Sequence, residues 1–131
     1  SRHQNPAIMQ KVEEVLKNLP TEDKGCRIEP VKLWGRDTVL FDRQICDEIE
    51  TACQRFGYTS HRMFGGAGHD AQYIATMIPS AMIFVPSING KSHCEEEDTS
   101  FEDCAKGADI LLETVLTMQT KYSMGQTYSL H

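Results

Sequence analysis

One uninterrupted apolar run limits the architectures open to this chain more than any other feature. Ser80-Ala81-Met82-Ile83-Phe84-Val85 is short, carries no charge and ends at Pro86-Ser87. Such a run is typical of a strand buried on both faces of a parallel sheet. A second strand is expected over residues 27–34, where Pro30 favours an edge position. Helical patterns alternate with these strands, which predicts an α/β layered fold.

Four segments have apolar residues at helical spacing, and most of them have recognisable ends. Asn5, Asp42, and either Thr99 or Ser100 are the expected N-caps, and Gly57 is the expected stop of the second helix. The patterns place the helices at about residues 6–19, 42–57, 68–78 and 100–118. In the third helix, Tyr73, Ile74 and Met77 are expected to point inward.

Two polar loops flank the apolar run and carry the candidate functional residues. The first, Gly65-Gly66-Ala67-Gly68-His69-Asp70-Ala71, has three glycines in four residues and then a base beside a carboxylate. The second, Pro86-Ser87-Ile88-Asn89-Gly90-Lys91-Ser92-His93, leaves the predicted strand. Backbone without Cβ atoms can approach another group closely. Catalytic residues often lie on loops at a sheet edge, so the pattern favours a functional site.

Each candidate also has a purely structural explanation. On residue type alone, His69 is a core or capping histidine at about even odds, and a glycine cluster can be only a tight turn. A loop histidine such as His93 is more often a surface residue, and Cys94 is more often an inert thiol than a metal ligand. Residues 95–98 form an acidic run that is typical of a solvated face. Each of the two loops combines glycines with a histidine beside the predicted strand, which favours the functional interpretation.

Composition and charge limit the partners and the compartment. The 131 residues suffice for one domain, with 40% hydrophobic and 24% charged residues. The net charge of -6 disfavours nucleic acid and anionic membranes. No apolar run approaches the roughly 20 residues that span a bilayer, and the polar residues 1–10 do not resemble a signal peptide. The five cysteines form no CxxC pair, so we expect a reduced, cytoplasmic protein.

Several short motifs follow one another in an order that resembles a known family. They are Gly66-Ala67-Gly68-His69-Asp70-Ala71, Met77-Ile78-Pro79, Met82-Ile83-Phe84-Val85-Pro86-Ser87, Asn89-Gly90, Ser92-His93, Glu102-Asp103-Cys104 and Gly107-Ala108. This arrangement, dense over about residues 41–118, resembles the closing segment of the N-carbamoyl-L-amino acid hydrolase, allantoate amidohydrolase and β-alanine synthase family. The resemblance implies a zinc-aminopeptidase-type, phosphorylase/hydrolase-like α/β catalytic domain and hydrolysis of carbamoyl or amide C–N bonds in small molecules.

The resemblance also assigns roles to individual residues. His93 matches the family's last metal ligand, and His69 matches a catalytic histidine that faces the substrate. Gly68 matches a backbone donor near the substrate carboxylate, and Asp70 is expected either to orient His69 or to cap the following helix. The family uses two divalent metal ions, zinc or manganese, which polarise the carbonyl and lower the pKa of a shared water.

The resemblance implies a division of the chain and two alternatives for its function. Residues 1–37 match a remnant of the lid or dimerisation domain, residues 38–121 the C-terminal part of the catalytic domain, and residues 122–131 a tail. In the family the other metal ligands and the glutamate base come from an N-terminal part that this sequence lacks. We therefore expect an amidohydrolase fragment that is inactive alone and binds one weak metal ion or none. The alternative is a non-catalytic domain that forms a homodimer or binds a partner, because a divided α/β domain exposes apolar faces.

Overall fold

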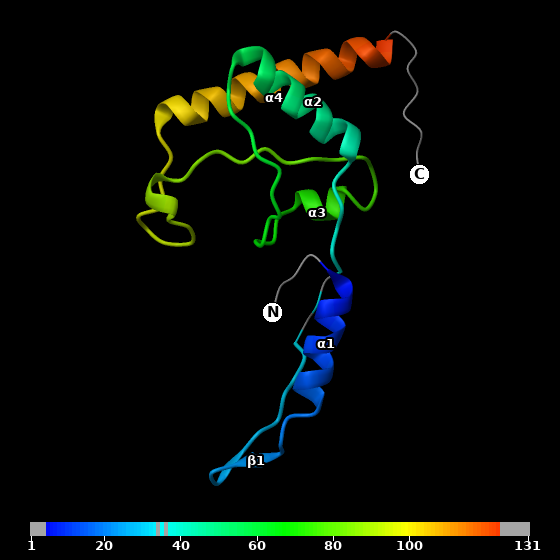
Figure 1. Cartoon of the computed structure of the whole chain (residues 1–131), viewed down its shortest axis with the longest axis vertical. Coiled ribbons are helices and arrows are strands. Elements are labelled where there is room, and N and C mark those ends of the chain that lie inside the picture. Colours follow the sequence, from blue (N-terminus) through cyan, green and yellow to red (C-terminus); the bar gives the residue numbers. More distant parts are fainter. Residues whose placement is uncertain (1–4, 34, 36, 124–131) are drawn as a thin grey trace. The chain divides into compact units, whose positions relative to one another are not determined.

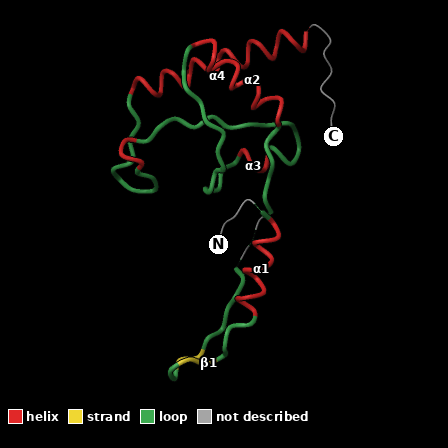
Figure 2. Tube along the Cα trace, viewed as in Figure 1, coloured by secondary structure: helices red, strands yellow, loops and turns green. Residues whose placement is uncertain are grey.

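The computed structural model of the chain describes residues 5–33, 35 and 37–123. Helices, one short hairpin of strands and long loops make up these residues, as the tube in Figure 2 shows. The chain divides into two compact units, residues 1–40 with 63–68 and residues 41–62 with 69–131. None of the helices in the described ranges is long and apolar enough to cross a bilayer.

The first unit begins with the helix α1 (Pro6–Lys17), which was predicted from the sequence. The Asn5 side chain accepts a hydrogen bond from the main-chain N–H of Ala7 at 3.0 Å, and Pro6 occupies the first turn. Pro6 suits that position because its missing N–H would have no partner inside the helix. The helix ends at Lys17, two residues before the predicted limit at residue 19, and Asn18 is its C-cap.

A short hairpin ends at Arg27, where the strand predicted at residues 27–34 should begin. β1 (Glu22–Asp23) pairs with β2 (Cys26–Arg27) across a turn in which Lys24 and Gly25 both have positive φ, 47° and 78°. Beyond Arg27 the described residues up to Leu33 form no strand, and Leu33 is 86% exposed. The prediction is wrong there because no further strand pairs with this segment; Trp34 lies outside the described residues.

The second unit is built on two helices, α2 (Arg43–Phe56) and α4 (Phe101–Ser123). Asp42 caps α2 by accepting the N–H of Ile45 at 2.9 Å, and Gly57 ends it with φ 70°, as predicted. Ser100, and not Thr99, caps α4, because its hydroxyl oxygen accepts the N–H of Asp103 at 3.1 Å. α4 extends past the predicted limit near residue 118 into the predicted tail, of which residues 124–131 lie outside the described part.

A small core lies where α2 and α4 meet, and ion pairs flank it. Its buried residues are Ala52, Cys53 and Ile110. Arg55 Nη1 lies 2.7 Å from Glu113 Oε1, so the end of α2 contacts the middle of α4. Glu48, near the start of α2, pairs with Lys121, near the end of α4. The two helices therefore run in opposite directions, which is visible in Figure 1 where α2 lies against α4.

The apolar run at residues 81–85 is not the buried strand that its sequence predicts. It runs as an unpaired stretch alongside α4 (Figure 1), and Ile83 packs against the core. No hydrogen bond joins residues 81–86 to any other described residue, and Phe84 and Val85 are exposed. A strand needs a hydrogen-bonded neighbour, and the only sheet among the described residues is the β1–β2 hairpin. The predicted parallel sheet is therefore not formed within this part of the chain.

The predicted helix at residues 68–78 is reduced to one turn, α3 (Ala71–Ile74), followed by further turns. Tyr73, Ile74 and Met77, which were predicted to point inward, are exposed, and Met77 is 83% exposed. The prediction fails because a short amphipathic helix is stabilised mainly by what packs against its apolar face, and the side chains of Ile74 and Met77 are exposed.

Candidate functional site

His69 lies at the N-terminal end of α3, in the second unit, and its side chain has a defined partner. Nδ1 accepts a hydrogen bond from the main-chain N–H of Ala71 at 3.0 Å, and the residue is exposed. Because Nδ1 is the acceptor, the neutral ring carries its proton on Nε2. Nε2–H is then a donor that can bind a carbonyl or carboxylate oxygen of a small molecule.

This contact changes the expectation for Asp70. Asp70 occupies the N-cap position of α3, but its side chain makes no capping hydrogen bond. The capping alternative for Asp70 is therefore wrong, because the His69 ring binds the free N–H at this helix end instead. That Asp70 orients His69 stays a prediction. Gly68 is exposed and belongs to the first unit, and its role as a backbone donor also stays a prediction.

The second loop is closed on itself by main-chain and side-chain hydrogen bonds. The N–H of Ile88 donates to the carbonyl of Asp98 at 2.8 Å, which joins the two ends of the loop. Inside it, a turn of 3-10 helix (Ile88–Gly90) leads to Lys91, whose carbonyl accepts a hydrogen bond from the Ser87 hydroxyl. The Lys91 ammonium pairs with Glu96 across the loop. These contacts give the loop its own structure although no strand supports it.

His93 lies in this loop with its side chain exposed. Its main-chain φ is 58°, in the left-handed region, and its N–H donates to Glu97 Oε2 at 2.7 Å. The next residue, Cys94, is exposed and its carbonyl accepts the N–H of Glu97 at 3.1 Å. The predicted metal ligand therefore lies on a short, internally bonded turn.

The described residues do not provide a complete metal site. Among them, no group of three or more His, Cys, Asp or Glu side chains could hold a metal ion. One exposed imidazole such as His93 suits a single ligand position for zinc or manganese, because neutral imidazole binds both ions. No hydrogen bond links His69 to His93 in the described residues, so a shared cleft stays a prediction. This part of the chain does not form a two-metal centre by itself.

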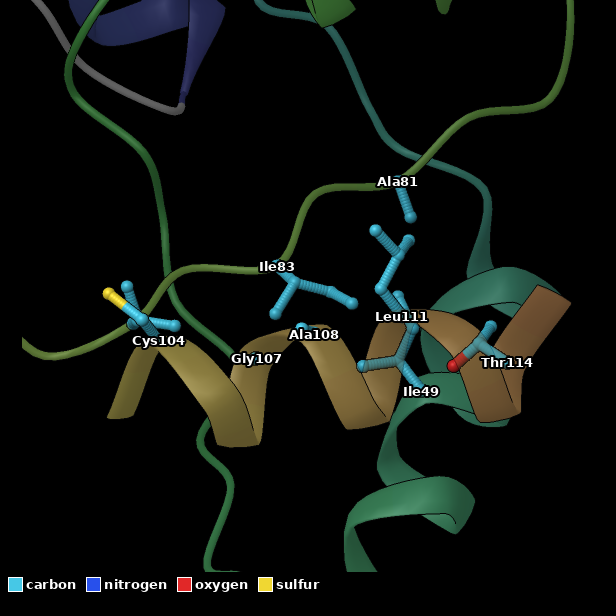
Figure 3. Close-up of a pocket in the computed structure, with 9 residues that line it drawn as sticks. Ile49, Ala81, Ile83, Cys104, Gly107, Ala108, Leu111 and Thr114 are labelled. Atoms are coloured by element: carbon cyan, nitrogen blue, oxygen red, sulfur yellow. The ribbon is translucent and has the colours of Figure 1, made fainter. Parts of the chain in front are cut away.

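An apolar pocket of about 400 Å³ lies in the second unit, and neither His69 nor His93 is among its lining residues. Figure 3 shows Ala81 and Ile83 on the extended segment facing Ala108 and Leu111 of α4, with Ile49 of α2 below. Thr114 is buried, and its hydroxyl donates to the Ile110 carbonyl at 2.7 Å. The described lining of the pocket is therefore mainly apolar, and no charged side chain belongs to it.

Two shifted pKa values in the second unit, those of Asp103 and Cys46, belong to its helices. The Ser100 hydroxyl donates to the Asp103 carboxylate at 2.7 Å, and this bond, with the ammonium of Lys106, lowers the pKa of Asp103. Burial raises the pKa of the Cys46 thiol. Both effects are those of a folded helix pair, and neither belongs to the loops that carry the candidate histidines.

Comparison with known proteins defines the class of this chain. Residues 4–117 match the family described as Peptidase family M20/M25/M40, and the chain belongs to this family. The membership supports a zinc-peptidase-like fold, and amidohydrolases of the family generally depend on divalent metal ions.

Particular relatives are amidohydrolases of N-carbamoyl-L-amino acids and of allantoate by name. The chain is 41% identical to an N-carbamoyl-L-amino-acid amidohydrolase of Rhizobium meliloti over 92 residues, 70% of the chain and 22% of the relative. It is 34% identical to the allantoate amidohydrolase of Escherichia coli K12 over 116 residues, 84% of the chain and 28% of the relative. It is 35% identical to the N-carbamoyl-L-amino acid amidohydrolase of Geobacillus stearothermophilus over 94 residues, 72% of the chain and 23% of the relative. The chain thus spans about a quarter of the length of these curated relatives.

Glu97 is the residue of the candidate site that the sequence did not single out. The acidic run at residues 95–98 was interpreted as a solvated face, but Glu96 and Glu97 bind groups inside the loop. The available signal was the separation of four residues between His93 and Glu97, which allows a side chain to reach back over one turn.

Proposed function

We propose that this chain forms the C-terminal part of the catalytic domain of a metal-dependent amidohydrolase. The substrate class is a small N-substituted amino acid or ureido acid whose carbamoyl or amide C–N bond is hydrolysed. Water adds its oxygen to the carbonyl carbon, the C–N bond breaks, and the leaving nitrogen takes up a proton. Residues 1–37 belong to the lid or dimerisation domain in this proposal, and residues 38–121 to the catalytic domain.

One observation carries the proposal. The two loop motifs, with His69 in the first and His93 in the second, occur in order within a chain that belongs to the M20 family. Relatives with 34 to 41% identity over most of the chain are named as allantoate or N-carbamoyl-amino-acid amidohydrolases. The exposed imidazoles of both residues are free to face a ligand, which a core histidine would not be.

The two histidines have different roles in this proposal. His93 supplies one imidazole ligand to a pair of zinc or manganese ions, and the other ligands come from polypeptide outside this chain. A divalent ion bound there supplies Lewis-acid polarisation of the carbonyl and a water of lowered pKa. His69 donates from Nε2–H to an oxygen of the substrate, because Nδ1 is held by the N–H of Ala71. Gly68 contributes a main-chain N–H near the substrate carboxylate. The chain alone is inactive.

A chimeric enzyme tests these roles. This chain replaces the matching 28% of the Escherichia coli allantoate amidohydrolase, and allantoate hydrolysis and bound metal are measured. We expect an active chimera in which His93→Ala lowers both bound metal and activity, the activity by more than about 100-fold, since outer partners of a metal ligand alone cost 10–100-fold. His69→Ala lowers activity and leaves the metal content unchanged.

The matched control is His61→Ala, which removes an exposed histidine of the second unit that has no assigned role. It is expected to keep the metal content and activity of the chimera. Full activity and full metal content in His93→Ala would refute the ligand role.

A second candidate function has its own supporting observation. The main chain of residues 81–86 has no hydrogen-bond partner among the described residues, and the adjoining pocket is apolar. We propose as the alternative that the isolated chain self-associates, with a second copy covering this surface. Light scattering across a concentration series tests this. A dimer that weakens in Phe84→Lys supports it, whereas a monomer at millimolar concentration contradicts it.

A further inference from the structure

The main chain at His93 adopts a conformation that needs an explanation. Its φ of 58° lies in the left-handed region, which a residue with a Cβ adopts only at a cost. Asn89 in the same loop also has positive φ, and asparagine and histidine both adopt this region more readily than most residues. The left-handed conformation of His93 still costs free energy, which a hydrogen bond to its main chain can offset.

Glu97 provides that contact. Its Oε2 accepts the N–H of His93 at 2.7 Å, and a carboxylate is a strong acceptor for a main-chain N–H. The main chain of Glu97 is itself fixed, because its N–H donates to the Cys94 carbonyl at 3.1 Å. The hydrogen bond between Ile88 and Asp98 closes the loop around this turn.

The other carboxylates of the acidic run do not perform this function. Glu96 pairs with Lys91, and Asp98 Oδ1 accepts the N–H of Thr99 at 2.8 Å. Glu95 makes no hydrogen bond or ion pair with another described residue. Glu97 is thus the member of the run that contacts the predicted ligand residue, and Glu95 offers a control of the same charge.

We propose that Glu97 is a positioning residue that sets the direction of the His93 imidazole. The direction of the Cα–Cβ bond relative to the neighbouring main chain depends on φ. A change of His93 from positive to negative φ would therefore point its imidazole in another direction. By holding the φ of His93 positive, the Glu97 carboxylate sets the orientation of the imidazole before any ligand binds. This inference rests on the proposed role of His93 as a metal ligand.

Nuclear magnetic resonance of the metal-free chain tests the positioning role. At positive φ the amide and α protons of one residue lie close together, which gives a strong intraresidue cross-peak. We expect this cross-peak at His93 in the wild-type chain and in Glu97→Gln, which keeps an acceptor oxygen, and its loss in Glu97→Ala. Exchange of the His93 amide proton should become about tenfold faster in Glu97→Ala, as expected for one lost hydrogen bond to a charged acceptor. Glu95→Ala is the matched control and should leave both signals unchanged.

Retention of the cross-peak in Glu97→Ala, or its equal loss in Glu95→Ala, would overturn the proposal. Should Glu97→Ala disturb the resonances of α4, Glu97→Asp replaces it, because it keeps the charge and shortens the reach and must also lose the cross-peak. These signals need no metal, so they separate the two proposals. If the His93→Ala chimera stayed active, the ligand role of His93 would be refuted. The hydrogen bond between the His93 N–H and Glu97, measured in the metal-free chain, would still stand. Lower bound metal in the Glu97→Ala chimera, with recovery in Glu97→Gln, would support both.

Discussion

Replacement of Gly107 by alanine tests whether the extended segment at residues 81–85 lies against α4. An alanine Cβ at position 107 would come within 2.6 Å of Val85 Cγ1, closer than two such carbon atoms can approach. Either the side chain of Val85 or the segment that carries it must move. Removing that methyl group in Val85→Ala should relieve the clash, so the two substitutions are expected to be coupled.

The expected free energies follow from two opposing effects. Alanine in place of glycine inside a helix favours folding by about 1 kcal/mol. Overpacking costs about 1–3 kcal/mol, and a value near 2 is expected because Val85 is 38% exposed and has room to move. In the wild-type background Gly107→Ala should therefore destabilise the chain by about 1 kcal/mol. In the Val85→Ala background the same substitution should stabilise it by about 1 kcal/mol, a coupling of about 2 kcal/mol.

Urea unfolding of the four chains, followed by the circular dichroism of the helices, measures this coupling. An equal effect of Gly107→Ala in both backgrounds, within about 0.5 kcal/mol, would refute the close contact between residue 107 and Val85. Such additivity would mean that Val85 does not contact α4, and the pocket between the segment and the helix would then be wrong as well. Phe84→Ala, a neighbour on the same segment, serves as a background in which no coupling is expected.

The remaining predictions concern groups with shifted pKa values. The pKa of Asp103 is lowered, chiefly by the hydrogen bond from Ser100, so its contribution to stability is full above the unfolded-state value near 3.8 and is lost as the pH falls below it. Ser100→Ala should therefore destabilise the chain less at pH 3 than at pH 7 in urea titrations, and an equal effect at both would contradict this account. The pKa of Cys46 is raised by burial, so iodoacetamide at pH 8 should alkylate it more slowly than the exposed Cys26 and Cys94, as read by mass spectrometry of peptides. Equal rates at all three would contradict the burial of Cys46.

Helix ends were predictable because they depend on local chemistry. Asn5 and Asp42 each bind an N–H two or three residues later, and Gly57 takes the left-handed conformation that ends α2. Each of these interactions involves residues close in the sequence, so the residues on either side are enough to specify it.

The strands were not predictable in the same way, because a strand depends on neighbours far away in the sequence or outside it. The run at residues 81–85 has the composition of a buried strand, yet the described residues supply no partner for its main chain. Residues 28–33 likewise follow β2 without joining a sheet among the described residues, although the N–H of Ile28 donates to the Thr21 carbonyl at 2.9 Å. Composition indicates what a segment can become, while its pairing depends on which polypeptide lies beside it.

The candidate site was predictable as far as residue types and loops are concerned. The sequence indicated His69 and His93, but the hydrogen bond of the His69 ring to Ala71 follows from the backbone geometry of one turn. Glu97 was hidden in the acidic run at residues 95–98, since charge composition alone does not separate a carboxylate in solvent from one that binds a main-chain N–H.

The way in which α2 and α4 are joined has a consequence for solution conditions. Their shared core contains few buried side chains, and the ion pairs Arg55–Glu113 and Glu48–Lys121 lie on either side of it. Dissolved salt screens such partly exposed charges, with a Debye length of about 10 Å at 0.1 M. The ionic strength of the buffer should therefore influence how firmly the two helices are held at their crossing, and crystals or spectra obtained at low and high salt can be expected to differ first at this junction.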